Sequence, residues 1–186
     1  MIKENETYKK VNFTSIKLAN EYDCCTFMDC NFENIQLSNI TFIECKFINC
    51  NLSNAKINVT GFKTVVFEKC KLLGVNFNES NLFLIRFTFI NCDLTLASFY
   101  QLVIKNTTFT NCNLQEVDFT ETNLLSSTFN NCDLSKAIFE NSNLEKVDFV
   151  TATNFIINPE INNIKKAIFC KDNIGGLLNH LQIVIK

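Results

Sequence analysis

The sequence predicts an all-β solenoid, a stack of similar coils with four sides. A large apolar residue (Phe, Leu or Ile) recurs at every fifth position from Phe27 to Phe87 and again from Leu94 to Phe149. A period of five matches neither the 3.6-residue period of a helix nor the two-residue period of a strand. Rows 20 residues apart match better than rows five apart, so one coil comprises four pentads.

Each pentad pairs its large central residue with a smaller residue two positions earlier. We expect both to point inward and the other three to face water, with coils about 4.8 Å apart as between strands. In one column the smaller residue is always cysteine, at Cys30, Cys50, Cys70, Cys92, Cys112 and Cys132. Thiols along a line cannot converge on one metal ion, so we interpret them as small apolar filler. Cys24 and Cys170 lie outside this pattern, which leaves their reactivity open.

The residues from Cys112 to Ser126 carry a resemblance to a known family. The pentads Cys-Asn-Leu-Gln-Glu, Val-Asp-Phe-Thr-Glu and Thr-Asn-Leu-Leu-Ser resemble those of the pentapeptide-repeat proteins. The resemblance covers roughly residues 11–151 and implies a right-handed quadrilateral β-helix. We therefore expect an N-terminal segment (1–10), a β-helix of about seven coils (11–158) and a C-terminal cap and dimerisation segment (159–186).

The repeat slips by two residues between Phe87 and Leu94. Extra residues in a regular stack must bulge outward or kink the rod. We expect a bulge around residues 88–91, with the apolar residues Phe83 just before it and Phe89 and Ile90 within it. Local packing of the bulge and a contact patch remain two open interpretations.

The chain after Phe149 breaks the pattern and then resumes it once, at Ala167-Ile168-Phe169. Asp172 can cap a short α-helix, although Gly175 and Gly176 weaken it. One interpretation is a cap that covers the last coil. We favour a cap that also forms a two-fold homodimer, through Ile174, Leu177, Leu178, Leu181, Ile183 and Ile185.

Charge is uneven along the chain, with 8 acidic and 3 basic side chains between Asp93 and Asp148 against a net charge of −2 overall. An acidic rod can occupy a basic DNA channel through the attraction that binds duplex phosphates. Alternatively, Asp and Asn serve turn geometry and solubility. The expected acidic surface comprises Asp93, Glu116, Asp118, Glu121, Asp133, Glu140, Glu145 and Asp148.

The order of the C-terminal elements (a pentad, a short helix with a Leu-Leu pair, a β-branched tail) resembles the Qnr quinolone-resistance proteins, a group of pentapeptide-repeat proteins. This resemblance implies a homodimer that binds DNA gyrase or topoisomerase IV by imitating duplex DNA and that modulates quinolone susceptibility. The alternative is a structural or regulatory scaffold for a partner other than a topoisomerase.

Catalytic motifs are missing from the sequence. The single histidine, His180, has no Ser/His/acid set around it, and no metal-binding or nucleotide-binding motif can be assembled. We predict a non-enzymatic protein with no catalytic residue, cofactor or metal, and no direct binding of nucleic acid. The start MIKENETYKK lacks a signal-like apolar stretch and no run is long enough to span a membrane, so we predict a cytoplasmic protein without membrane contact.

Overall fold

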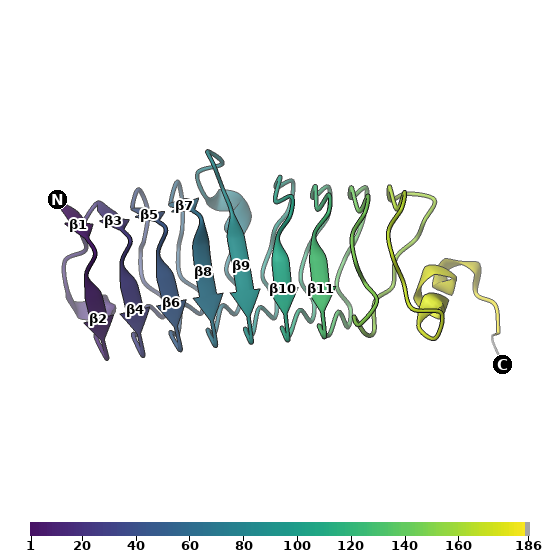
Figure 1. Ribbon diagram of the computed structural model, residues 1–186, viewed down its shortest axis with the longest axis horizontal. Coiled ribbons are helices and arrows are strands. Elements are labelled where there is room, and N and C mark those ends of the chain that lie inside the picture. Colours follow the sequence, from purple (N-terminus) through teal and green to yellow (C-terminus); the bar gives the residue numbers. More distant parts are fainter. Residues whose placement is uncertain (185–186) are drawn as a thin grey trace.

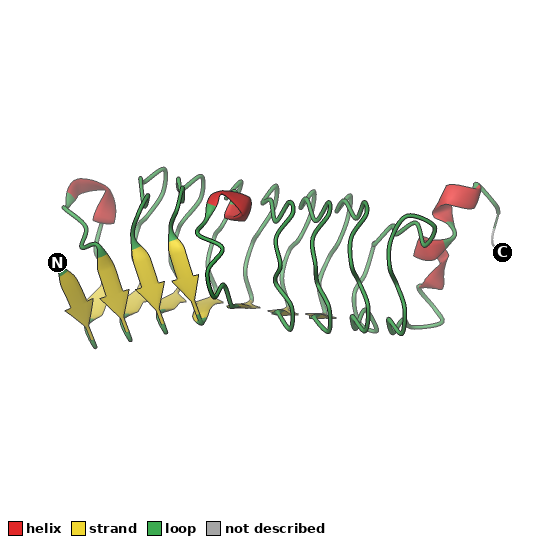
Figure 2. Cartoon of the chain, turned by 90° about the horizontal axis from the view of Figure 1, so that it is seen from above, coloured by secondary structure: helices red, strands yellow, loops and turns green. Residues whose placement is uncertain are grey.

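The computed structural model describes residues 1–184 and forms an elongated rod of stacked β-coils, with the two termini at opposite ends (Figure 1). Short 3-10 helices interrupt the coils and close the C-terminal end (Figure 2): η1 (Phe13–Ser15), η2 (Phe77–Glu79), η3 (Ile174–Leu177) and η4 (Asn179–Leu181). The strands are β1 (Ile2–Glu4), β2 (Thr7–Lys9), β3 (Glu21–Asp23), β4 (Thr26–Met28), β5 (Thr41–Ile43), β6 (Lys46–Ile48), β7 (Gly61–Lys63), β8 (Val65–Glu68), β9 (Phe87–Ile90), β10 (Thr108–Thr110) and β11 (Thr128–Asn130).

Four ladders run along the rod, one on each side. The first side is the sheet β2-β4-β6-β8-β9-β10-β11, and the fourth begins as the sheet β1-β3-β5-β7. All pairings between these strands are parallel. Single bridges form the second side, Asn12–Asn31–Asn51–Lys71–Asp93–Asn113–Asp133–Thr153. The third side carries the bridges Gln36–Lys56 and Asn76–Ser98–Asp118–Ile138. The predicted four-sided β-solenoid is therefore confirmed.

The core consists of columns of identical or similar side chains. Phe109 stacks on Phe129 with ring centroids 4.9 Å apart, and Phe77 on Phe99 at 4.8 Å, both with nearly parallel rings. In-register parallel pairing places equivalent residues one strand spacing apart, about 4.8 Å, which suits offset stacking of aromatic rings. The 20-residue period of the sequence thus becomes a continuous aromatic column.

Some of the small inward positions hold thiol or hydroxyl groups that donate to backbone carbonyls. The thiol of Cys70 lies 3.3 Å from the carbonyl oxygens of Phe47 and Glu68, and Cys30, Cys50 and Cys92 make equivalent contacts. Thr60 and Thr122 occupy the small inward position that directly precedes the fourth-side ladder residue. Their hydroxyls donate at 2.8 Å to backbone carbonyls of the preceding coil. These cysteines are free and buried, as the interpretation as core filler requires.

The two-residue slip lies earlier than predicted, in residues 82–86. Phe89, not Phe87, pairs with Phe67 and Phe109 on the first side, while Phe87 pairs with Val65. The placement of Phe89 and Ile90 in a bulge was therefore wrong, because both lie in β9 and Phe89 is fully buried. Phe87 and Phe89 are equally apolar, so a period of five could not decide which one continued the column.

Leu82, which the period assigns to the core, is instead exposed. Phe87 fills the core position that Leu82 leaves empty: the centre of its ring lies 5.1 Å from that of Phe77 and 5.6 Å from that of Phe62. A larger ring from the returning chain therefore replaces the leucine that the repeat would have buried. Leu82, Phe83 and Leu84 form an exposed segment, which we call the insert tip.

The C-terminal end differs from the predicted α-helix, since only the 3-10 helices η3 and η4 form there. Gly175 and Gly176 have low helix propensity, and Gln182 ends the second turn in the left-handed region at φ 53°. Asp172 does not cap: the residue before η3 is Asn173, whose side-chain amide donates instead to Ala152 O at 2.8 Å. This bond ties the turns to the last coils.

Parallel pairing extends beyond both predicted ends of the β-helix. Ile2 pairs with Glu21 near the N-terminus, and Ile168 pairs with Asp148 near the other end. Phe169 stacks on Phe149 at 5.2 Å, as expected for the additional pentad. None of the helices within residues 1–184 has the length and apolar character needed to cross a membrane.

Candidate interaction surfaces

Chemically reactive groups are few on the surface of the rod. Cys24 is exposed, but hydrogen bonding to the Asp23 carboxylate raises the pKa of its thiol and disfavours the thiolate. Burial raises the pKa of the Cys45 thiol to about 12. Across residues 1–184 no group of three His, Cys, Asp or Glu side chains is arranged to hold a metal ion. The sides of the rod and its C-terminal end are the candidate interaction surfaces.

The predicted acidic residues gather mainly on two adjacent sides. Asp93, Glu116 and Asp133 lie on or beside the second-side ladder, and Asp118, Glu121 and Glu140 on the third. Asp148 pairs on the first side and Glu145 follows the fourth-side ladder, so these two lie apart from the others. We call the second and third sides between residues 93 and 140 the acidic sides.

Several aspartates of this surface have a structural task. The carboxylates of Asp93, Asp118 and Asp133 each accept the backbone N–H two residues later, at 3.2, 2.9 and 3.0 Å. Asn31 and Asn113 make the same turn in other coils at 3.0 and 3.1 Å. Because asparagine can serve this turn, the geometry does not require the charge.

Neighbouring side chains neutralise some of the negative charges on the acidic sides and stabilise others. Lys136 lies 3.2 Å from Glu116, an exposed ion pair of small energetic value. Partial desolvation raises the pKa of Asp133, but hydrogen bonds from Asn154, Ser135 and Gln115 outweigh it and lower the pKa to about 2. Glu121 and Glu140 are exposed, and within residues 1–184 neither makes such an ion pair. Negative charge therefore persists at this surface over the physiological pH range.

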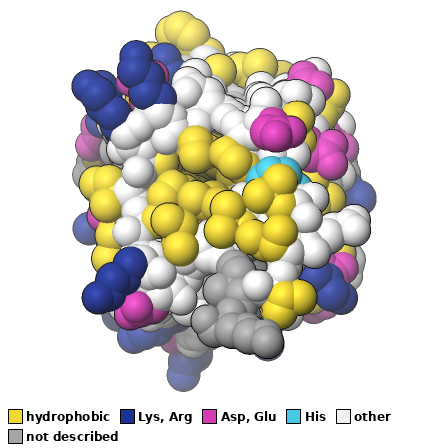
Figure 3. Space-filling view, turned by 90° about the vertical axis from the view of Figure 1, so that its right-hand side faces the viewer, with side chains coloured by type: hydrophobic (Ala, Val, Ile, Leu, Met, Phe, Trp, Pro, Cys, Tyr) yellow, Lys and Arg dark blue, Asp and Glu magenta, His cyan; other side chains and the backbone are white. Residues whose placement is uncertain are grey.

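The C-terminal end presents an apolar face. In the end-on view hydrophobic side chains gather at the centre, with charged groups around them (Figure 3). Ile174, Leu181 and Ile183 are about half exposed there, whereas Leu177 is buried and Leu178 half-buried. Leu177 thus belongs to the core of the monomer. We call Ile174, Leu181, Ile183 and Val184 the terminal face; the predicted contact residue Ile185 lies outside the described residues.

The turns that carry the terminal face are locked against the last coil. A Cβ added at Gly176 would lie 2.2 Å from the carbonyl oxygen of Phe155, so only glycine allows this approach. The carbonyl of Gly176 also accepts from Ile157 N at 3.0 Å. The glycines that weaken an α-helix therefore permit close packing of the cap.

The insert tip projects from the fourth side, where the ladder is interrupted. Asn81 still pairs with Gly61, but within the described chain no bridge joins Asn81 to Val103 of the next coil. Leu82, Phe83 and Leu84 are 65%, 64% and 64% exposed. Phe83 therefore lies within the bulge, and not just before it as predicted.

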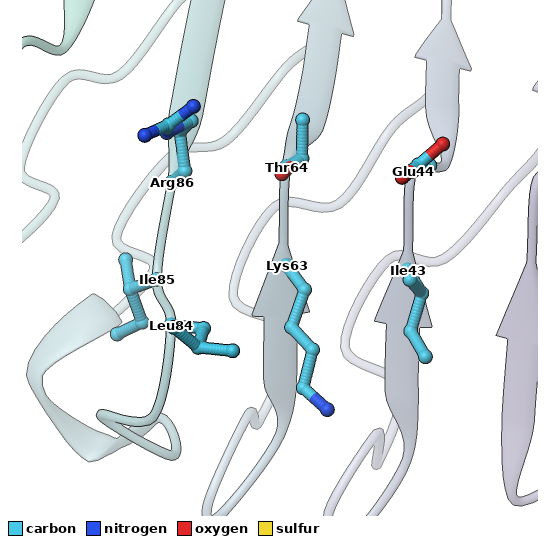
Figure 4. A pocket seen from close by; sticks show the side chains of 7 residues that line it. All are labelled: Ile43, Glu44, Lys63, Thr64, Leu84, Ile85 and Arg86. Carbon is cyan, nitrogen blue, oxygen red and sulfur yellow. The ribbon is translucent and has the colours of Figure 1, made fainter.

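A hollow of about 410 Å³ lies beside the insert tip, between Leu84, Ile85 and Arg86 and the neighbouring coils that carry Lys63 and Glu44. Leu84 extends toward Lys63 from the inserted segment (Figure 4). The ammonium of Lys63 lies 5.6 Å from the centre of the Phe83 ring, within range of a cation–π contact. The apolar tip thus has cationic neighbours.

An apolar hollow on the third side was missed by the sequence reasoning. It has a volume of about 300 Å³ between Ile138, Ile156 and Ile161, with Ala137 and Phe139 at its floor and Lys136, Glu140 and Asn158 at its rim. We call it the isoleucine hollow. The sequence did contain a signal for this hollow. Ile138 occupies the third-side ladder position, and the residues at that position in the preceding coils are all polar: Gln36, Lys56, Asn76, Ser98 and Asp118.

The fold and these surfaces define a class of protein: a repeat rod that offers long sides and one apolar end for contact. The chain belongs to the pentapeptide-repeat family. The family model described as a pentapeptide repeat region matches residues 84–153, and that described as pentapeptide repeats (8 copies) matches residues 25–58.

Two solved structures of QnrB1 share the fold at low sequence identity. A trypsin-treated form of QnrB1, described as a plasmid-mediated fluoroquinolone resistance protein, aligns over 100% of both chains with a TM-score of 0.66 and 14% identity. Full-length QnrB1 aligns over 98% of this chain and 100% of its own, with a TM-score of 0.58 and 14% identity. HetL of the cyanobacterium Nostoc, described as involved in heterocyst differentiation regulation, has a TM-score of 0.41 and 15% identity over 89% and 86% of the two chains. A comparison with curated protein sequences finds no match.

Proposed function

We propose that this protein is a non-enzymatic binding protein whose acidic sides occupy the DNA-binding site of a type II topoisomerase, DNA gyrase or topoisomerase IV. The observation that carries the proposal is the segregation of charge. Asp93, Glu116, Asp118, Glu121, Asp133 and Glu140 share two adjacent sides over these coils, against Lys136 as the single cation among the charged residues there. A narrow rod with negative charge along one flank meets a basic channel as duplex DNA does.

We infer that two copies join through the terminal face. Ile174, Leu181, Ile183 and Val184 are 47%, 51%, 55% and 82% exposed, and a two-fold contact would cover them on both copies. The dimer would place both acidic regions around its centre. The overall likeness to QnrB1 supports the rod shape on which this arrangement depends.

The dimer predicts a sedimentation mass of about twice the 21.3 kDa chain. Leu181→Asp should abolish this end-to-end dimer, because a charge on the terminal face opposes burial. The matched control is Leu96→Asp, since Leu96 is 56% exposed on the second side, far from the end. A monomeric wild-type protein would contradict the dimer while leaving the acidic sides to be tested separately.

A supercoiling assay with purified gyrase tests the topoisomerase proposal. We expect the wild-type protein to inhibit supercoiling at micromolar concentration and to alter quinolone-induced cleavage. Changing the exposed Glu116, Glu121 and Glu140 together to Gln should weaken inhibition about tenfold or more, because electrostatic complementarity is lost. The control changes Glu4, Glu33 and Glu44, which are exposed elsewhere, to Gln. If the wild type neither inhibits nor protects at micromolar protein, the proposal is wrong.

A further inference from the structure

We propose that the rods associate side by side, with the insert tip of one copy entering the isoleucine hollow of another. Both halves of this contact are present on every chain. Neither depends on a topoisomerase or on the terminal face. The inference therefore goes beyond the proposed function and can fail or succeed independently of it.

The tip has the properties of an anchor. Leu82, Phe83 and Leu84 are consecutive, large and apolar, and each is nearly two-thirds exposed. Burial of such a side chain removes apolar surface from water and therefore favours association. Phe87, three residues after the tip, is fully buried among Phe62, Phe77 and Phe89, so the tip projects from a well-packed part of the core. The backbone N–H of Phe83 also donates to Asn81 Oδ1 at 3.0 Å, which helps to hold the turn. A projection held in this way loses less conformational freedom when it docks.

The hollow has the matching shape and chemistry. The three isoleucines that form its walls, Ile138, Ile156 and Ile161, are 44%, 50% and 45% exposed, above the buried Phe139 and Ala137. A volume of about 300 Å³ accommodates one aromatic side chain such as that of Phe83. Buried apolar anchors of this kind dominate the energy of protein–protein contacts.

The charges around the two surfaces are complementary. The tip lies beside Lys63 and Arg86, with Glu44 at the far edge of its hollow. The isoleucine hollow has Glu140 at its rim, Asp118 on the same ladder as Ile138, and Glu160 next to Ile161 in sequence. Its cation, Lys136, is already paired with Glu116 at 3.2 Å. Docking therefore brings unlike charges together, which selects this orientation of the two copies.

The fourth side reinforces this match. In the later coils, Lys105, Lys146, Lys165 and Lys166 follow the buried positions of this side, and Glu145 is the acidic residue among them. This cationic part of the fourth side can lie along the acidic third side of the neighbouring copy. Because the two patches differ, the contact is heterologous and can repeat from copy to copy. It would also cover an acidic side, so side-by-side association and topoisomerase binding would exclude each other.

Two single variants test the contact by complementation. Phe83→Asp destroys the tip and keeps the hollow; Ile138→Asp destroys the hollow and keeps the tip. We expect fluorescently labelled Ile138→Asp protein to bind Phe83→Asp protein in an anisotropy titration, because one intact tip meets one intact hollow. The control is the double variant titrated against itself, which keeps the terminal face and lacks both halves of the contact. Both residues are exposed, and circular dichroism and thermal melting check that each variant folds.

The expected result is at least about tenfold tighter binding for the complementary pair than for the double variant, the loss typical of removing an interface anchor. Raising the salt concentration should weaken the complementary pair because the flanking charges are exposed. Equal binding of the two pairs, or no binding of the complementary pair at concentrations on the order of 100 µM, would overturn the proposal.

Discussion

The second and fourth sides of the rod are built from the same repeat, and yet their later coils carry opposite charge. On the second side one unbroken ladder runs from Asn12 to Thr153, and its later coils carry Asp93, Glu116 and Asp133. On the fourth side the ladder breaks after Asn81, the insert tip projects, and lysines follow the buried positions. The comparison shows that the inward residues determine the fold, while the outward residues and one short insertion determine the surface.

The largest effect is expected from Phe87, which compensates for the break on the fourth side. Phe87→Ala should lower the free energy of unfolding by about 3–5 kcal/mol, because a fully buried ring is lost. Leu82, the repeat residue for this position, is exposed to solvent and does not fill the resulting cavity. Urea unfolding measures this loss. Phe83→Ala, the matched change at the exposed tip, should stay within about 0.5 kcal/mol of the wild type. Equal losses would mean that the tip is part of the core.

Restoring the repeat should make the fourth side resemble the second. The variant lacks Phe83 and Leu84 and carries Phe87→Val. We expect Leu82 to return to a buried position, and the new valine at position 87 to occupy the small inward position that Val65 occupies in the preceding coil. The amide of Val103 could then donate to the preceding coil, as Asn123 N donates to Leu102 O at 2.7 Å. We expect hydrogen exchange at Val103 to slow by about tenfold or more. Unchanged exchange would show that the insertion does not cause the break.

Fold and site differ in how far they could be predicted. Columns such as Phe109–Phe129 were readable because in-register stacking demands the same residue at every turn. The location of the insertion could not be predicted, because Phe87 and Phe89 are the same residue type and either could continue the buried column. The terminal turns were misjudged because Gly176 packs against Phe155, a contact that local helix signals do not contain. The isoleucine hollow needs residues from three separate pentads, so no single motif displays it.

A smaller effect separates charge from turn geometry on the acidic sides. Asp118 accepts the amide of Thr120 at 2.9 Å, a bond that asparagine also makes in other coils. Asp118→Asn should therefore change the free energy of unfolding by less than about 0.5 kcal/mol, whereas Asp118→Ala should lower it by about 1 kcal/mol. Thermal melting of both variants measures the difference. An equal loss for Asn and Ala would show that the charge itself stabilises the coil.

The smallest effect concerns acid. The pKa of Asp133 is lowered from 3.8 to about 2, because its hydrogen bonds outweigh its desolvation. A group with a depressed folded-state pKa stabilises the protein above its unfolded pKa and loses that contribution as pH falls through the folded value. The melting temperature of the wild type, relative to Asp133→Asn, should therefore decline between about pH 4 and pH 2. A constant difference across this window would contradict the assigned hydrogen bonds.

The most direct test of the central claim is displacement of a labelled DNA duplex from purified gyrase. If the acidic sides occupy the DNA site, wild-type protein at micromolar concentration should release the duplex. The variant with Glu116, Glu121 and Glu140 changed to Gln should require about tenfold more protein. Retention of the duplex at every concentration of the wild-type protein would contradict the account.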